Sequence, residues 1–324
     1  MSTFDISRRR FILSGGGTVL GLSSFPVFSA TPGDKGEFRS RLYTPTSIVK
    51  IKDKYFIVDC WQHRVIWSKE LGKRIEEWQA LDEDIAGPHS IVSDGEFYVV
   101  EDTGRHAIKV FKENNDGFEM VQAIPNVGKR PHRTVYDDQG DRFFVVGSTD
   151  QSLHVLKKQG GSLVLSSSMP LQEMQGEYCK SLTLTNNTLY VTGKTKIAAY
   201  ELGRNGVFFS GVVHLHEKCR EMNDLFFLDG KKGFATSWWG RVSFFEDVKE
   251  LEAGGIDVSP NLGGVPYYFS RFDGKLWLTE INQCSRICGY ESFGHKGELV
   301  GGSVLFDFCG VDESSIERKR SFPV

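Results

Sequence analysis

Two histidines, each directly after a proline, are the side chains whose type and spacing most directly suggest chemistry. His89 stands in the stretch AGPHSIVSDG, and His132 follows 43 residues later in RPHRTVYDD. Histidine nitrogen is a preferred ligand of Zn²⁺, whereas Ca²⁺ takes oxygen ligands. If the fold brings the two segments together, the pair predicts a divalent metal site, with Zn or Ca as the candidate ion. The alternative is that both imidazoles hydrogen-bond to channel waters and neighbouring backbone.

Lys180 and Tyr267 suggest proton transfer. A lysine that is desolvated beside other cations has a lowered pKa and acts as a base, and a tyrosine then serves as the proton donor. Abstraction of a proton next to a carbonyl requires such a pair. Asp102 is a third candidate for moving protons. The structural alternative is that Lys180 pairs with a carboxylate such as Glu177 and that Tyr267 packs.

These residues belong to an internal repeat, which predicts the elements that position them. Six segments each contain a short apolar run, a turn rich in Asp, Gly or Asn, a second run such as FYVV, and a third such as AIKVF. The second residues of the segments are spaced by 43 to 48 residues, and they are Thr46, His89, His132, Lys180, Asn223 and Tyr267. Short β-branched and aromatic runs between turn residues predict strands of an antiparallel meander.

A further β-like stretch follows the third run, so each unit has four strands. Four antiparallel strands with a period in the forties are typical of a propeller blade, and six units predict an all-β, six-bladed β-propeller. Because a blade buries its faces only against its neighbours, residues 36–312 are expected to form one domain. The segment 36–43 is expected to supply an outer strand that closes the ring, and residues 313–324 are expected to be a charged tail.

The predicted fold places the repeated positions in one ring. Consecutive strands are antiparallel, so the start of the first strand and the end of the second lie at the same end of a blade. The first strand is innermost, so the six second residues are expected to surround the channel mouth. Asp59, Glu101 and Asp102 end second strands and His106 lies just beyond, so they are expected above or beside that ring. We therefore predict a small polar ligand at the mouth, bound by Thr46, Asp59, Glu101, His106 and Asn223.

Two of the units resemble NHL repeats. FIVD, which ends at Asp59, is followed by QHRVI, and VVED, which ends at Asp102, is followed by HAI. NHL repeats carry an acidic residue at the end of the second strand and an Asn/His-Arg-Ile-like element that opens the third. The resemblance covers nearly all of the chain beyond the first 30 residues. It implies a six-bladed propeller, a fold that hosts both binding modules and enzymes.

Two further resemblances concern the strand openings. GPH and RPH are similar to the openings that supply zinc-binding histidines in peptidyl-hydroxyglycine amidating lyase, which implies His89 and His132 as ligands. That lyase takes three histidines from its ring, whereas the other ring positions here hold Thr, Lys, Asn and Tyr. Met222-Asn223-Asp224 resembles the openings of gluconolactonase-type propellers, where Asn and Asp line a calcium site.

Two functions stay open from these residues. The first is a metal-assisted lyase or hydrolase, in which the ion polarises a ligand oxygen or activates water. The second is a non-catalytic binding or scaffolding propeller of the cell envelope that grips a partner with the same face.

Residues 1–30 have the layout of an export signal. SRRRFI, which begins at Ser7, resembles the twin-arginine motif. The apolar stretch that follows is interrupted by glycines, and a stable span needs about 20 apolar residues. We expect passage through the twin-arginine translocase to the bacterial periplasm, with an uncleaved inner-membrane anchor as the alternative.

Charge and cysteine content exclude some partners and leave one question open. The chain has 39 Lys and Arg against 42 Asp and Glu, a formal net charge of −3, so nucleic acid is not an expected partner. Six cysteines form no CxxC pair. A local disulfide between Cys284 and Cys288 and a set of free, buried thiols are both open, and any disulfide would form after export.

Overall fold

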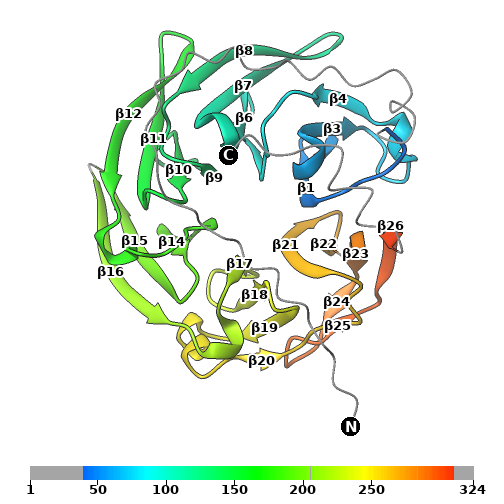
Figure 1. The fold of residues 1–324 in the computed structure, drawn as a ribbon, viewed down its shortest axis with the longest axis vertical. Coiled ribbons are helices and arrows are strands. Elements are labelled where there is room, and N and C mark those ends of the chain that lie inside the picture. The colour runs from blue at the N-terminus through cyan, green and yellow to red at the C-terminus, as the bar shows by residue number, and fades with distance from the viewer. Residues whose placement is uncertain (1–38, 205, 283, 310–324) are drawn as a thin grey trace, which may run out of the picture. The chain divides into compact units, whose positions relative to one another are not determined.

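The computed structural model describes residues 39–204, 206–282 and 284–309. In this part of the chain, strands form six four-stranded antiparallel sheets around a central axis (Figure 1). The predicted all-β, six-bladed propeller is confirmed. The expected signal, the C-terminal tail and the ends of the expected domain lie outside the described residues. No helix within the described ranges has the length and apolarity to cross a membrane.

Each blade is built from strands that follow one another in the chain. Blades 1 and 2 contain β1 (Pro45–Ile51), β2 (Lys54–Asp59), β3 (Arg64–Ser68), β4 (Gln79–Asp82), β5 (Ile91–Ser93), β6 (Phe97–Asp102), β7 (Ala107–Asn114) and β8 (Gly117–Pro125). Blades 3 and 4 contain β9 (Pro131–Asp137), β10 (Arg142–Gly147), β11 (Ser152–Gln159), β12 (Ser162–Pro170), β13 (Ser181–Thr185), β14 (Thr188–Thr192), β15 (Lys196–Gly203) and β16 (Gly206–His214). Blades 5 and 6 contain β17 (Met222–Phe227), β18 (Gly233–Ser237), β19 (Arg241–Phe245), β20 (Ile256–Asp257), β21 (Val265–Phe272), β22 (Lys275–Ile281), β23 (Cys284–Tyr290) and β26 (Ser303–Cys309).

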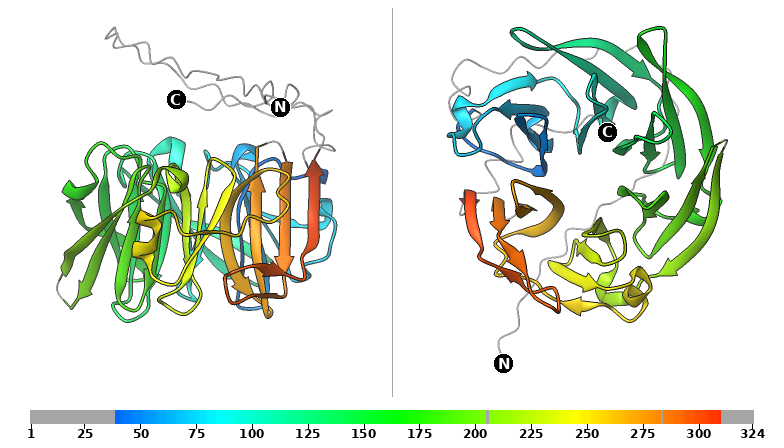
Figure 2. Two further views of the ribbon diagram at one scale, coloured as in Figure 1. Left: turned by 90° about the horizontal axis from the view of Figure 1, so that it is seen from below. Right: turned by 180° about the vertical axis from the view of Figure 1, so that it is seen from behind.

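The strands run between two faces of the ring, as the side view in Figure 2 shows. We call the face where the inner strands β1, β5, β9, β13, β17 and β21 begin the strand-start face, and the opposite one the strand-end face. Tight turns join inner to second strands on the strand-end face. Between β13 and β14, Asn186 and Asn187 have φ of 46° and 61°, the left-handed pair that a two-residue hairpin turn of type I′ requires. The turn residues in the sequence therefore set the hairpins.

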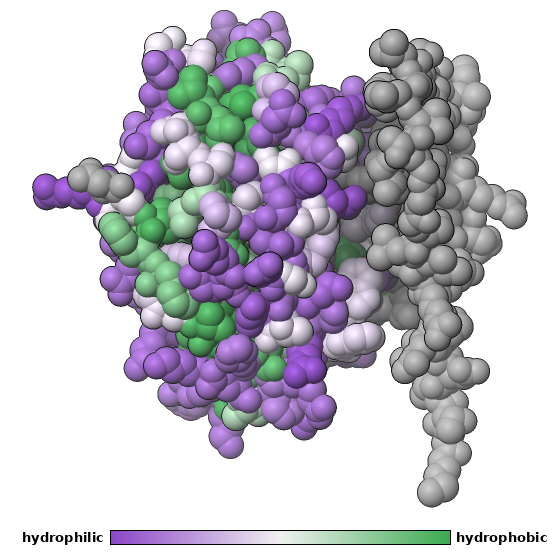
Figure 3. All heavy atoms as spheres, turned by 60° about the vertical axis from the view of Figure 1, so that its left-hand side comes forward, coloured by the Kyte–Doolittle hydropathy of each residue, from purple (hydrophilic) through white to green (hydrophobic). Residues whose placement is uncertain are grey.

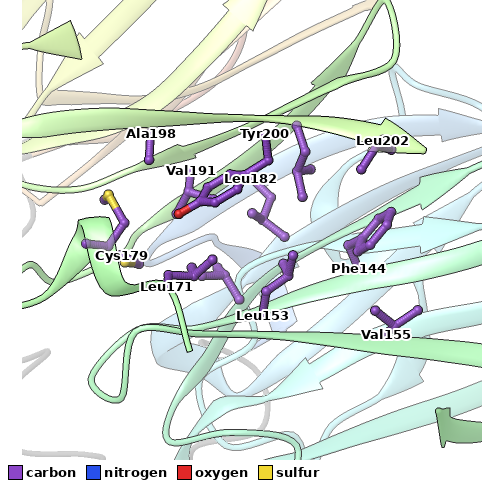
Figure 4. Packing of buried hydrophobic residues seen from close by; sticks show 13 residues of the cluster. Phe144, Leu153, Val155, Leu171, Cys179, Leu182, Val191, Ala198, Tyr200 and Leu202 are labelled. Carbon is purple, nitrogen blue, oxygen red and sulfur yellow. The ribbon is translucent and has the colours of Figure 1, made fainter. Parts of the chain in front are cut away.

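The core lies between neighbouring blades. Figure 4 shows the cluster between blades 3 and 4, where Phe144 and Leu153 meet Leu182, Val191 and Tyr200. These side chains are almost completely buried, and comparable clusters join the other blades. Since each blade covers the next, a single blade would expose both of its apolar faces to water.

The outer rim is mixed in polarity. Figure 3 brings forward the side that carries β12 and β16, where hydrophobic and hydrophilic side chains are interspersed. On β16, Phe208 and Phe209 are 60% and 49% exposed. Scattered apolar side chains of this kind are common on soluble proteins.

The ring closes differently from the expectation. Residues 39–43 form no strand, and β26, from the C-terminal side, is the outer strand of blade 6. A small hairpin, β24 (Ser292–Phe293) with β25 (Leu299–Val300), lies between β23 and β26 in the chain. Leu42 packs with Ile48 of blade 1 and Ile287 of blade 6, and the Ser285 hydroxyl donates a hydrogen bond to the Tyr43 carbonyl. The segment before β1 therefore closes the ring by packing.

Of the alternatives left open for the cysteines, the local bond between Cys284 and Cys288 does not form. Cys284 pairs with Cys309, 25 residues away, and joins β23 to β26. Cys284 and Cys288 lie on the same strand four positions apart, which is roughly 13 Å and too far for a disulfide. Cys288 is a buried free thiol, as are Cys60, Cys179 and Cys219.

Candidate functional site

A β-bulge at the start of the inner strands brings the ring residues to the pore. In β9, Pro131 pairs with Gly147 and Arg133 with Val146, so His132 is an extra residue without a partner in the ladder. The same shift occurs at Thr46 in β1, Asn223 in β17 and Tyr267 in β21. Bulges bend a strand and re-aim its side chains, and they are frequent near functional sites. Four of the six ring positions are thus presented by the same local device.

The two histidines meet face to face. The ring centroids of His89 and His132 are 3.6 Å apart and their planes differ by 14°. Across blade 1, the Tyr267 hydroxyl lies 3.2 Å from Nδ1 of His89, and the Cys60 thiol lies 3.9 Å from its Nε2. Tyr178 stands edge-on to His132 at 5.9 Å. Side chains from five segments of the chain therefore meet in one cluster at the pore.

Lys180 and Asn223 form the other side of the ring. The Lys180 ammonium donates a hydrogen bond of 3.1 Å to Oδ1 of Asn223, whose amide donates to the Pro266 carbonyl at 2.9 Å. Lys180 also lies 5.1 Å above the Trp238 ring. Glu177, the carboxylate considered as its partner, instead accepts hydrogen bonds from the backbone and the hydroxyl of Thr195. The lysine is thus positioned by an amide and an aromatic ring.

Burial sets the protonation states of this cluster. Burial, followed by neighbouring positive charge that includes Arg133 and Lys180, lowers the pKa of His89 and of His132 well below the usual value of 6.5. Burial also lowers the pKa of Lys180 to about 8, and it raises the pKa of Tyr267 well above its usual value. At neutral pH the imidazoles are therefore neutral acceptors, and the lysine can gain or lose a proton.

Asp59 and Asp102 hold loops instead of facing the ring residues. Asp59 accepts the backbone N–H groups of Tyr43 and Thr44 at 3.0 and 2.7 Å and pairs with Arg64 at 3.1 Å. Asp102 repeats this one blade later, with the N–H of Ala86 at 2.7 Å and Arg105 at 3.1 Å. Each carboxylate therefore fastens the chain segment that enters the inner strand of its own blade, β1 for Asp59 and β5 for Asp102.

The remaining predicted ligand-binding residues are divided between the ring and its supports. The Thr46 hydroxyl lies 3.4 Å from the Pro88 carbonyl and links blades 1 and 2. Glu101 is fully buried and accepts hydrogen bonds from the backbone and hydroxyl of Ser90 at 2.8 and 2.6 Å. His106 is exposed and left-handed at φ 56°, and its Nδ1 accepts the N–H of Arg130 at 3.1 Å. Glu101 and His106 thus support the loops around the ring.

The donor set does not fit a divalent metal. Because the imidazole planes of His89 and His132 are nearly parallel, their in-plane lone pairs cannot converge on one ion. The charged neighbours that act on both rings include Arg133 and Lys180, which repel a cation. Among the described residues, no three His, Cys, Asp or Glu side chains are grouped so that they could hold a metal. We therefore derive no step through a metal.

As a first test, we expect the purified protein to contain substoichiometric Zn and Ca by elemental analysis, and EDTA to leave its thermal midpoint unchanged. One equivalent of either metal, lost in a His89→Ala/His132→Ala variant, would contradict it.

A second layer of polar residues below the ring was not anticipated. The ring residues are each followed by another polar residue, and these are Ser47, Ser90, Arg133, Ser181, Asp224 and Tyr268. Arg133, from blade 3, lies 4.4 Å over the Tyr268 ring of blade 6 and 3.8 Å from Asp224. In a regular strand, consecutive side chains point to opposite faces. The bulge explains how His132 and Arg133 both reach the pore. In the sequence, the two consecutive polar residues at each strand start were the pattern that could have predicted this second layer.

A cavity of about 640 Å³ lies on the strand-end side of this second layer. Its polar floor is formed by Ser90, Arg133, Thr134, Asp224 and Tyr268. Its walls combine apolar residues with polar ones that include Ser93, Thr183 and Thr185. The exposed turn residues Gln139 and Asn187 belong to its rim, so it opens on the strand-end face. The six ring residues do not line it.

Comparisons with known proteins show the fold. No protein-family model matches the chain, and no curated protein matches it. A candidate 6-phosphogluconolactonase from Bacteroides fragilis superposes with a TM-score of 0.58 at 14% identity, over 80% of this chain and 82% of that chain. A periplasmic gluconolactonase from Pseudomonas aeruginosa gives a TM-score of 0.56 at 13% identity, over 81% and 85%. The structural neighbours of this six-bladed propeller thus include gluconolactonase-type propellers, and at these identities the likeness concerns the fold alone.

Proposed function

We propose that this protein is an exported propeller that binds a small polar ligand at the strand-start end of its pore and hydrolyses it. One observation carries the proposal: two neutral imidazoles and a lysine with a pKa of about 8 gather with Asn223 and Tyr267 around one pore. Titratable groups whose pKa values are shifted by burial are frequent at catalytic sites.

The proposed mechanism uses the two sides of the ring. Nδ1 of His132 is buried and has no hydrogen-bond partner among the described residues, so the neutral ring acts as general base on a water molecule. The Lys180 ammonium, held by Asn223, stabilises the oxyanion that develops on the attacked carbonyl. Lys180 then gives a proton to the leaving oxygen, which breaks the ester bond. His132 afterwards releases its proton to solvent and Lys180 takes one up from solvent, so that both groups return to their starting states.

The substrate class to test first is a cyclic ester. Two of the structural neighbours are a candidate 6-phosphogluconolactonase and a gluconolactonase. A lactone has the carbonyl and the leaving oxygen that this arrangement would serve. Export is supported by the twin-arginine-like SRRRFI stretch and by the Cys284–Cys309 disulfide, since disulfides persist in oxidising compartments.

The pH profile tests the mechanism. We expect kcat/KM for lactone hydrolysis to fall as pH rises through about 8, because the charged form of Lys180 is the active one. On the acid side the rate should persist to well below pH 6.5, because the imidazoles stay neutral there. Lys180→Met should lower kcat/KM by about 10²-fold to 10³-fold, whereas the exposed Lys157→Met is the matched control.

The opposite pH dependence would point to a different reaction. If Lys180 is a base that removes a proton next to a carbonyl, the rate rises through the same pH and Lys180→Arg is inactive. Hydrolysis with Lys180 as the acid predicts that Lys180→Arg keeps part of the activity and loses the inflection.

A non-catalytic envelope protein is the second candidate. Trp61, Trp238 and Trp239 follow second strands on the strand-start face and are 44%, 40% and 68% exposed. Exposed tryptophans are frequent anchors in binding surfaces. Absence of turnover with lactones and esters, together with capture of an envelope component that Trp239→Ala abolishes, would favour this function.

A further inference from the structure

The cavity on the strand-end side ends on an arginine whose hydrogen-bond donors are unused. Arg133 is only 2% exposed, and none of its three guanidinium nitrogens has a hydrogen-bond partner among the described residues. A buried guanidinium without acceptors is costly, so its donors need oxygen atoms from a bound molecule or from water. The Thr134 hydroxyl on the same floor is also buried and unpartnered.

The neighbouring carboxylates make their hydrogen bonds elsewhere, although Asp224 stays within ion-pair distance of Arg133. Asp224 is 3.8 Å from Arg133, which is beyond hydrogen-bond distance, and it accepts the Ser181 hydroxyl at 2.6 Å. Glu101 accepts two hydrogen bonds from Ser90. Tyr268 covers one face of the guanidinium, which leaves its N–H edges as the available contacts. Such a planar fork matches the two oxygens of a carboxylate.

The walls above this floor are largely aliphatic and aromatic, with Ser93, Thr183 and Thr185 among them. They include Val49, Ile51, Val135, Leu184 and Phe269, while Gln139 and Asn187 lie at the rim. A volume of about 640 Å³ is within the range of pockets that enclose small ligands. A carboxylate at the floor and an apolar body against the walls would satisfy both parts of the cavity.

We propose that this cavity is a second ligand site, separate from the ring at the strand-start end, and that it binds small monocarboxylic acids with an apolar body through Arg133. The carboxylate pairs with the guanidinium edge, the Thr134 hydroxyl adds a donor, and the chain of the ligand replaces water along the walls. This site does not depend on the proposed hydrolysis, because the residues assigned to that reaction do not line the cavity.

Asp224 makes the site pH-dependent. Burial raises the pKa of Asp224 to about 6, against the effect of Arg133. The groups whose charges act on Arg133 are Asp224, Glu101, Tyr267 and Tyr268. As pH falls through about 6, Asp224 takes up a proton, and the site loses one negative charge. Carboxylate affinity should therefore increase, and Asp224→Asn should bind about tenfold more tightly than the unmodified protein at neutral pH, a change of about 1.4 kcal/mol.

Calorimetric titration of the whole protein with hexanoate tests the site. We expect saturable binding, and at least tenfold weaker binding of hexan-1-ol, which lacks the carboxylate. Arg133→Met should lose at least tenfold in affinity and Arg133→Lys should lose less. Lys157→Met is the surface-charge control, and Lys180→Met should bind hexanoate normally even if it abolishes hydrolysis.

A cavity-filling variant tests the site even if the Arg133 variants fail to fold. Leu184→Trp narrows the cavity and keeps Arg133, so it should weaken hexanoate binding while circular dichroism stays unchanged. The proposal is overturned if hexanoate and hexanol bind equally, if Arg133→Met binds like the unmodified protein, if inorganic phosphate competes as well as hexanoate, or if no binding is measured.

Discussion

Breaking the disulfide between Cys284 and Cys309 is expected to lower the free energy of unfolding by about 3 to 4 kcal/mol, the value for a closed loop of 25 residues. The bond ties the outer strand β26 to β23, and a small hairpin separates these two strands in the chain. Without the bond, the unfolded chain gains freedom and β26 has fewer constraints on its detachment. Urea unfolding of a Cys284→Ser/Cys309→Ser variant measures the change.

A matched control separates the bond from the loss of sulfur. Cys288 lies on the same strand and is buried but free, so Cys288→Ser should have a clearly smaller effect. Reduction of the unmodified protein should reproduce the loss seen in the double variant. Equal unfolding curves for oxidised and reduced protein would show that the disulfide does not contribute to the free energy of unfolding.

Asp59→Ala is expected to cost about 3 to 5 kcal/mol, the range for removing one partner of a buried ion pair. Asp59 is fully buried and serves Arg64, which is 2% exposed, together with the two backbone amides that lead into β1. These donors lose their shared carboxylate inside the protein, where water cannot replace it. Thermal and urea unfolding measure the loss.

Asp102→Ala is the matched comparison for Asp59→Ala. Asp102 has the same place in blade 2, but the side chain of its partner Arg105 is 47% exposed and can be hydrated. The expected cost is therefore about 1 to 3 kcal/mol, mainly for the N–H of Ala86. A larger loss for Asp102→Ala than for Asp59→Ala would refute the argument from burial.

The periodicity of the chain was sufficient to predict the propeller and to bring distant ring residues together. Strand alternation and turn residues are local signals, and six near-equal repeats leave few other closed arrangements. His89, Tyr267 and the Lys180–Asn223 pair meet because identical positions in each blade face one axis. The twin-arginine signal remains a prediction, since residues 1–30 lie outside the described part.

The features that the sequence did not predict depend on three-dimensional geometry that is not visible in the residue types or their spacing. The bulge at His132 turns both it and Arg133 toward the pore, whereas simple alternation would send them to opposite faces. Asp59 holds the backbone of Tyr43 and Thr44, and this contact depends on how the loop before β1 folds over the carboxylate. The sequence shows only an acidic residue at the end of a strand, which suggested a ligand site. The partner of Cys284 is in a strand that returns after an inserted hairpin, and the spacing of the cysteines does not reveal that return.

The way the ring closes has a mechanical consequence. Five of the six junctions between blades are crossed by the chain itself, but blades 6 and 1 are the two ends of the described propeller, and no described sheet spans them. The propeller is therefore a ring with one junction, between blades 6 and 1, that is held together by side-chain packing around Leu42. Because the disulfide joins two strands of blade 6, it stabilises blade 6 but does not link blade 6 to blade 1. Under force or heat, blades 6 and 1 should separate first. The pore would then open on one side while the individual blades stay folded.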